Sequence, residues 1–247
     1  MNRVLLCILL ACSGQLSAAQ PTLQWCLDHF PPRHIYQPGM TEPSGPMVDM
    51  MHELARRSGF TLSFSVPTPT ERCLKYLTAG KTDMVTGVVS TPERAQQLLL
   101  APFDIARTES WFVRSDQQQA EKTAIRRVAL LKSKVYRATL ASELQQKGFN
   151  VLWLENTEQA LAALLLNETD AVIGPEHRLG YAIATQPRYK DKLVLLNTGA
   201  APVTYANLAM AANGPHAELF NSISNELTLM MTEGKTRFYP VAEQPEQ

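Results

Sequence analysis

The stretch with the clearest chemical potential runs from 82 to 94 and reads T-D-M-V-T-G-V-V-S-T-P-E-R. Residues 84–89 are mostly apolar and rich in valine, which predicts a strand buried on both faces. Thr91 is a good N-cap and Pro92 suits the first helical position, so a helix should begin directly after the strand. Backbone N–H groups at a helix start attract anions, and Arg94 adds a planar cation suited to a carboxylate. The stretch predicts a carboxylate-binding corner; the simpler alternative is a capped helix with a solvent-exposed arginine.

Two other polar positions lie where a predicted helix begins or a predicted strand ends. Arg72 closes the P-x-x-R run that starts at Pro69, at the entry of a predicted helix. It could bind a second acidic group of a ligand, or it could be an exposed arginine. Glu176, followed by His177 and Arg178, comes just after a predicted strand, where parallel sheets place their ligands. The alternative for this segment is a solvated turn.

Several function classes find no support in the sequence. Asp28, His29 and His34 lie close together, but their spacing fits no zinc signature. There is no G-x-S-x-G or Walker motif. The 23 basic and 23 acidic residues balance, so no positive excess is available for nucleic acid. We therefore expect no metal, no cofactor and no nucleic-acid partner.

Residues 1–19 are typical of a secretory signal peptide. Arg3 is followed by a continuous apolar run over 4–11, and small residues at 17–19 precede Gln20. The run is too short to span a membrane stably. We expect cleavage and export to the periplasm. As an alternative, the L-L-A-C run that ends at Cys12 loosely resembles a lipoprotein cleavage box.

Cys26 and Cys73 are the two cysteines that remain after the predicted signal peptide. Exported proteins meet an oxidising environment, in which two such cysteines form a disulfide. The alternative is a pair of buried thiols.

Strand and helix patterns alternate on both sides of the opening stretch. Ser90 with Glu93 has capping-box spacing, so the helix after the strand could also begin one residue earlier. Apolar residues at helical spacing, each run followed by a glycine, predict two helices before residue 82, at 47–58 and 71–79. The expected elements are strands at 23–27, 60–66, 84–89, 128–131 and 205–211, and helices at 47–58, 71–79, 136–147 and 215–231.

A second copy of this pattern follows later in the chain. The run L-x-x-L-x-x-G-x-T-D at 74–83 is echoed by L-x-x-L-x-x-N-x-T-D at 161–170. Gly80 and Asn167 occupy the same position in the two runs. Glycine and asparagine are the residue types best able to adopt a left-handed helix cap. The chain therefore contains two similar α/β units with parallel sheets. Their ligand-binding strand ends should face each other across a cleft.

Taken together, the motifs resemble the extracellular solute-binding proteins of family 3, the periplasmic receptors of polar amino acid importers. They are a Pro-Pro after the first strand, G-x-x-x-D from Gly45 to Asp49, the L-x-x-L run, S-T-P-E-R ending at Arg94, and T-D-A-V-I ending at Ile173. The resemblance covers nearly all of the chain after the signal peptide. It implies two α/β lobes joined by hinge strands, lobe I being 20–110 plus 205–247 and lobe II 111–204.

The resemblance also implies roles for individual residues. In the family, the arginine that corresponds to Arg94 clamps the ligand carboxylate, and backbone groups near Gly87 and Ser90 complete that site. Phe30 corresponds to an aromatic residue that packs on the ligand. Family members open the second lobe with a Gly-Ser or Gly-Thr turn that caps the carboxylate; here Ser133 lies in that turn, without a glycine.

One position departs from the family pattern. Amino-acid receptors usually place an aspartate, which pairs with the ligand ammonium, five residues after the Asp170 equivalent. This chain has Pro175 there, followed by Glu176, which could substitute.

These observations predict a monomeric periplasmic binding protein that captures a small carboxylate-bearing polar solute between its lobes for an ABC importer. Two alternatives share the fold. One is a cyclohexadienyl dehydratase-like enzyme, for which Glu176 is the candidate general acid. The other is a ligand sensor for a membrane signalling partner.

Overall fold

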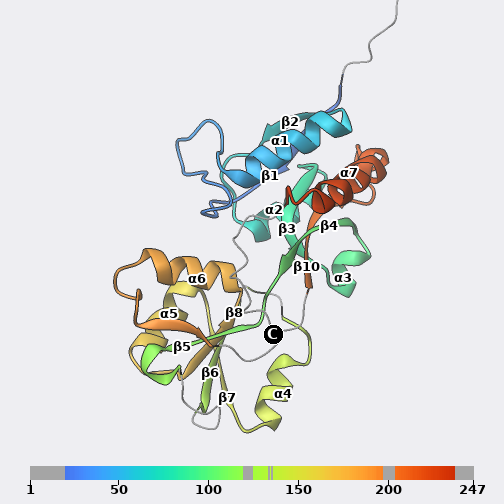
Figure 1. Cartoon of the computed structure of the whole chain (residues 1–247). Coiled ribbons are helices and arrows are strands. Elements are labelled where there is room, and N and C mark those ends of the chain that lie inside the picture. Colours follow the sequence, from blue (N-terminus) through green and yellow to red (C-terminus); the bar gives the residue numbers. More distant parts are fainter. Residues whose placement is uncertain (1–19, 119–124, 133, 135, 197–203, 237–247) are drawn as a thin grey trace, which may run out of the picture.

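The computed structural model describes residues 20–118, 125–132, 134, 136–196 and 204–236. The chain forms two α/β lobes, each built on a five-stranded sheet (Figure 1). Each lobe has its own buried apolar core. Within the described residues, no helix is both long enough and apolar enough to cross a membrane.

The first lobe combines the N-terminal part of the described chain with its C-terminal end. Its sheet has the order β2-β1-β3-β10-β4. The strands are β1 (Thr22–Cys26), β2 (Thr61–Phe64), β3 (Met84–Val89), β4 (Leu98–Ala106) and β10 (Thr204–Ala211). The helices are α1 (Pro46–Ser58), α2 (Thr70–Thr78), α3 (Pro92–Ala95) and α7 (Phe220–Thr232), with a 3-10 turn η3 (Ala217–Leu219) before α7.

The second lobe comes from the middle of the chain. Its sheet has the order β7-β6-β8-β5-β9. The strands are β5 (Ser110–Arg114), β6 (Arg127–Leu131), β7 (Asn150–Leu154), β8 (Ala171–Gly174) and β9 (Leu193–Leu196). The helices are α4 (Leu140–Gln146), α5 (Thr157–Leu165) and α6 (Glu176–Thr185), with a 3-10 turn η1 (Ser115–Gln117).

The sheets are mixed, whereas strand–helix alternation predicts parallel sheets. The repeated strands are parallel as expected: β1 pairs in parallel with β2 and β3, and β6 with β7 and β8. Two strands run antiparallel to these, β10 beside β3 and β5 beside β8. The edge strands β4 and β9 pair antiparallel with β10 and β5, so they run in the same direction as the repeated strands.

The passage out of the first lobe is short. β4 ends at Ala106 in the first sheet, and β5 begins at Ser110 in the second. Thr204 already belongs to the first sheet, so the chain has returned by that residue. Sequence reasoning missed β4, β5, β9 and α6. Pro102 interrupts the apolar pattern of β4, and proline is accommodated there because β4 lies at the edge of its sheet.

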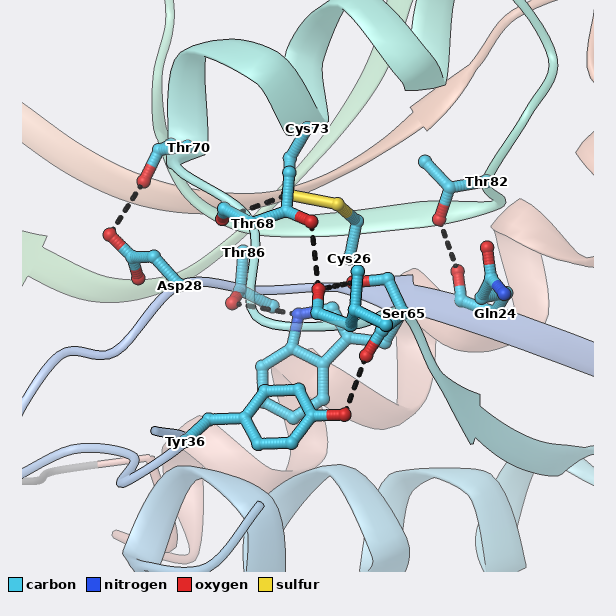
Figure 2. The surroundings of a disulfide bond; sticks show 12 residues. Gln24, Cys26, Asp28, Tyr36, Ser65, Thr68, Thr70, Cys73, Thr82 and Thr86 are labelled. Carbon is cyan, nitrogen blue, oxygen red and sulfur yellow. Dashed lines mark hydrogen bonds between the residues drawn. A yellow bond between two sulfur atoms is a disulfide. The ribbon is translucent and has the colours of Figure 1, made fainter. Parts of the chain in front are cut away.

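The repeated Thr-Asp pair has a structural role in the first lobe. Thr82 Oγ1 donates to the carbonyl of Gln24 on β1 over 2.8 Å (Figure 2), and Asp83 Oδ2 accepts from the N–H of Gln24 over 2.7 Å. Gly80, just before the pair, has a φ of 67°. The predicted left-handed cap is therefore confirmed, and the pair joins the start of β3 to β1.

The second lobe repeats this arrangement. Thr169 Oγ1 donates to the carbonyl of Arg127 over 2.9 Å, and Asp170 Oδ2 accepts from the N–H groups of Arg127 and Arg126 over 2.8 and 3.0 Å. Asn167 takes the left-handed position with a φ of 60°. The sequence repeat therefore reflects one hydrogen-bonding device used twice.

The structure contains the predicted disulfide between Cys26 and Cys73 (Figure 2). Both residues are buried, and the bond joins the end of β1 to α2. It therefore connects two elements that both contribute residues to the cavity between the lobes.

Candidate ligand-binding site

A cavity of about 350 Å³ lies between the two lobes. Lobe I contributes the end of β1 with the loop after it, β3, and the start of α2, and lobe II contributes Lys134 and the start of α6. Ligands of this fold class bind where parallel strands end, and both lobes present such ends here. The charged or polar side chains that line the cavity are Asp28, Arg33, His34, Thr70, Glu71, Thr86, Arg94, Thr108, Lys134, His177 and Arg178.

Asp28 is the acidic residue most firmly held at this cavity. Its Oδ1 lies 3.0 Å from Nε2 of His34, and its Oδ2 accepts from Thr70 Oγ1 over 3.0 Å (Figure 2). Burial alone would raise the pKa of Asp28, but the hydrogen bond from His34 and the charge of Arg178 hold it at about 2. The carboxylate is therefore ionised at neutral pH.

Phe30 lies in the loop after β1 and contacts lobe II. The backbone of Phe30 and the backbone of His34 exchange two hydrogen bonds of 2.9 and 3.0 Å, which shape the loop. The Phe30 ring lies 5.0 Å from the ring of His177, and the guanidinium of Arg178 lies over it at 4.1 Å. Phe30 is thus the aromatic surface of the cavity on which a group from lobe II already stacks.

Arg94 and Gly87 also line the cavity. Thr91 is the N-cap of α3, its Oγ1 accepting from the N–H of Arg94 over 3.2 Å, so the later of the two predicted helix starts is correct. Nη1 of Arg94 donates to the carbonyl of Val89 over 2.9 Å. Gly87 has a φ of 78°, in the left-handed region, and sits at the cavity without a side chain.

The helix start contributes little to the predicted carboxylate-binding corner. α3 has only four residues, because the chain turns into β4 shortly after Ala95. So few aligned peptide dipoles sum to a weak macrodipole. Ser90 is exposed and is not among the residues that line the cavity. What remains of the predicted corner is the guanidinium of Arg94 beside the backbone of Gly87.

Arg72 is exposed and lies outside the cavity lining. Glu71 and Leu74 line the cavity from the same helix, α2. Successive residues of a helix are turned by about 100°, so the face that carries Glu71 and Leu74 leaves Arg72 pointing elsewhere.

Glu176 also lies outside the cavity lining. Its Oε2 accepts from Ser110 Oγ over 2.9 Å and its Oε1 from Nη1 of Arg107 over 3.3 Å. The N–H of Glu176 donates to the carbonyl of Arg107 over 2.9 Å. Glu176 therefore fastens the start of α6 to the segment where the chain crosses between lobes.

His177 and Arg178, the next two residues of α6, line the cavity. The sequence had singled out Glu176 instead. The pKa of His177 falls to about 3, because it is buried and because Arg33, Arg178 and Lys134 are nearby. His177 is therefore neutral at physiological pH. The sequence signal was the E-H-R run after a strand end, in which the second and third residues, rather than the first, reach the cavity.

The turn that opens the second lobe contributes a lysine. Ser133, the predicted contact, lies outside the described residues. Lys134 lines the cavity, and burial together with the charge of Arg178 lowers its pKa to about 8. No sequence motif pointed to Lys134 or to Arg33. The guanidinium of Arg33 forms a buried ion pair with Asp104.

The histidines of the first loop are engaged by the protein itself. Nδ1 of His29 accepts from the N–H of Tyr36 over 3.1 Å, and His34 contacts Asp28. Over the described part of the chain, no group of three or more His, Cys, Asp or Glu side chains is arranged to hold a metal ion.

Comparison with protein families identifies the chain. The model of the bacterial extracellular solute-binding proteins, family 3, matches residues 23–237. The chain belongs to this family. The resemblance inferred from the S-T-P-E-R and T-D-A-V-I motifs is thereby confirmed. No curated protein matches the sequence.

Solved structures share the fold of this solute-binding protein. An arginine 3rd transport system periplasmic binding protein from Legionella pneumophila aligns with a TM-score of 0.68 and 18% identity, covering 88% of this chain and 96% of that one. The periplasmic VFT2 domain of BvgS from Bordetella pertussis gives 0.66 and 17%, covering 88% and 94%. The ancestral amino acid-binding protein AncCDT-1, a precursor of cyclohexadienyl dehydratase, gives 0.63 and 21%, covering 87% and 91%. The likeness confirms the two-lobed periplasmic binding protein fold.

Proposed function

We propose that this solute-binding protein captures a small carboxylate-bearing polar solute, an amino acid or a related compound, in the cavity between its lobes. The observation that carries the proposal is the meeting of Phe30, Gly87 and Arg94 at one cavity that both lobes line. Its volume of about 350 Å³ suits a small molecule. Closure of the lobes about the crossing segments would enclose the solute.

Arg94 is the proposed clamp for the ligand carboxylate. A guanidinium offers two parallel N–H donors that match a carboxylate, and Nη1 of Arg94 is oriented by its hydrogen bond to Val89. A charge-assisted hydrogen bond of this kind contributes about 1.5–3 kcal/mol. Phe30 would supply apolar contact.

The proposed setting is the periplasm, after removal of residues 1–19, with an ABC importer as partner. The family consists of extracellular solute-binding proteins. The similarity to the Legionella pneumophila protein, an arginine 3rd transport system periplasmic binding protein, also favours transport.

Binding is favoured over catalysis by the position of Glu176. A dehydratase would need a general acid beside its substrate. The carboxylate of Glu176 is bonded to Arg107 and Ser110 and does not line the cavity. Incubation of the purified protein with prephenate and arogenate should leave both unchanged; turnover of either would favour the enzyme.

The experiment that tests the proposal is a thermal-shift and calorimetric screen against amino acids, dicarboxylates and small peptides. At least one carboxylate should raise the melting temperature of the wild type. Arg94→Ala should abolish that shift while its own melting temperature stays close to the wild-type value. A ligand shift that persists in full in Arg94→Ala would refute the clamp. Arg188→Ala, which removes an exposed arginine of lobe II paired with Glu158, is the matched control and should keep the shift.

A further inference from the structure

We propose that Arg178 sets the charge selectivity of the cavity. Its guanidinium fills a cation-binding subsite of lobe I formed by Phe30 and Asp28. The cavity therefore takes solutes with more acidic than basic groups and rejects solutes that end in a guanidinium. This inference rests on the proposed function and names the class of solute that the same cavity selects.

The contacts of Arg178 are those that a bound cationic side chain would make. Its guanidinium carbon lies 4.1 Å from the centroid of the Phe30 ring, and its Nη2 lies 3.5 Å from Oδ2 of Asp28. A cation over an aromatic face, beside a carboxylate, is a favourable arrangement for guanidinium recognition. Here the cation is supplied by the protein itself, from α6 of the opposite lobe.

The subsite is held in place by lobe I alone. Asp28 is bonded to His34 and Thr70, and Phe30 is fixed by backbone hydrogen bonds to His34. None of these contacts involves Arg178. Truncation of Arg178 should therefore leave the ring and the carboxylate in position and expose them to a solute.

The charges that line the rest of the cavity favour an anion. Asp28 pairs with Arg178, and Arg33 pairs with Asp104. The other charged groups of the lining are Arg94, Lys134 and Glu71, two cations and one acid. Arg94 is the proposed partner of one ligand carboxylate, so Lys134 is available for a second acidic group.

The test compares the wild type with Arg178→Ala by isothermal titration calorimetry, using L-arginine and L-glutamate as probes. The variant should bind L-arginine at least about tenfold more tightly than the wild type. The reason is that the guanidinium of L-arginine no longer competes with that of Arg178 for Phe30 and Asp28. It should bind L-glutamate more weakly than the wild type does. Arg188→Ala, an exposed arginine of the same lobe, should match the wild type for both probes.

A second variant keeps the inference open to refutation. Adding Asp28→Asn to Arg178→Ala should remove the gained affinity for L-arginine, because the subsite loses its charge. The inference is overturned if the wild type binds L-arginine as tightly as a folded Arg178→Ala variant, or if the gain survives Asp28→Asn. The proposed carboxylate clamp has its own readout: if Arg94→Ala leaves carboxylate binding intact while Arg178→Ala still gains L-arginine, the clamp fails and the role of Arg178 stands.

Discussion

At the scale of single residues, the cavity is a place where buried charges influence one another. Burial and the nearby charges of Arg33, Arg178 and Lys134 lower the pKa of His177 and keep it neutral. Asp28 is the acid closest to Arg178 and stays ionised well below neutral pH. The local field is therefore positive near the start of α6. A solute must satisfy that field, because few water molecules remain to screen it once the lobes close.

Lys134 should make ligand binding depend on pH in the alkaline range. Its pKa of about 8 means that the ammonium loses its proton between pH 7 and 9, whereas an ordinary lysine would keep it. The groups that act on it are Arg178, of the same sign, and Asp28 and Glu71, of opposite sign. Affinity for the tightest-binding dicarboxylate of the ligand screen should fall by roughly tenfold from pH 7 to pH 9.

Calorimetric titrations at both pH values, on the wild type and on Lys134→Gln, check this. The variant lacks the titrating ammonium, so its affinity should be low at pH 7 and nearly unchanged at pH 9. An equal loss of affinity in both proteins would assign the pH dependence to another group.

At the scale of elements, two local devices fix the strands that carry the site. The Thr-Asp pairs bond β3 to β1 and β8 to β6 in the same way. The disulfide bonds the end of β1 to α2. Neither Thr-Asp pair lines the cavity, so these bonds should affect stability before they affect recognition.

Loss of the disulfide should destabilise lobe I. Cys26 and Cys73 are 47 residues apart in sequence. A cross-link over a loop of this length lowers the entropy of the unfolded chain by an amount worth about 3–4 kcal/mol. The Cys26→Ala/Cys73→Ala double variant should therefore unfold at a clearly lower urea concentration. A midpoint equal to that of the oxidised wild type would contradict this, and the wild type in excess reductant is the control.

The two Thr-Asp pairs allow a matched comparison between lobes. Asp170 accepts two backbone N–H groups and also pairs with Nη2 of Arg127 over 2.7 Å, whereas Asp83 accepts from the backbone of Gln24. Asp170→Asn should cost about 1–3 kcal/mol of unfolding free energy, since the bonds it weakens involve a charged group. Asp83→Asn should cost less. Urea unfolding of both variants measures the two free energies. A larger loss of unfolding free energy for Asp83→Asn would contradict the expected order.

At the scale of the whole molecule, the segment between β4 and β5, where the chain crosses from lobe I to lobe II, is bonded to α6 of lobe II. Glu176 fastens α6 to Arg107 through its backbone and its side chain, so α6 must follow any movement of the crossing. His177 and Arg178 are carried by the same helix and meet Phe30 of the other lobe. The site is therefore divided between two bodies, and its geometry depends on how they close.

Acid should destabilise both lobes together. Burial opposes ionisation of Asp28 in lobe I and Asp170 in lobe II, but their hydrogen bonds and nearby cations lower the pKa of each to about 2, against an ordinary value of 3.8. The unfolded chain therefore takes up these protons first. The stabilisation is complete above about pH 4 and is lost as the pH falls toward 2, at most about 2 kcal/mol for each group.

Thermal unfolding measured between pH 2 and 5 checks the expectation. Asp170→Asn lacks one of the two carboxylates, so its melting temperature should fall less steeply below pH 4. An identical pH profile for wild type and variant would show that other groups dominate acid unfolding.

The sequence alone determined the plan of this protein. Short-range residue patterns predict the two α/β units, the left-handed caps at Gly80 and Asn167, and the helix start at Thr91. Such patterns are informative because backbone conformation depends mainly on neighbouring residues. The disulfide pairing followed because only Cys26 and Cys73 remain after the predicted signal peptide.

Only the tertiary structure decided which side chains meet in the cavity. Glu71 rather than Arg72, and His177 and Arg178 rather than Glu176, line it. Each choice depends on where a helix begins and how it is rotated, and one residue of offset turns a side chain by about 100°. The contact of Arg178 with Phe30 joins residues far apart in sequence on different lobes, so no local pattern encodes it. The charge that the cavity selects follows from that contact.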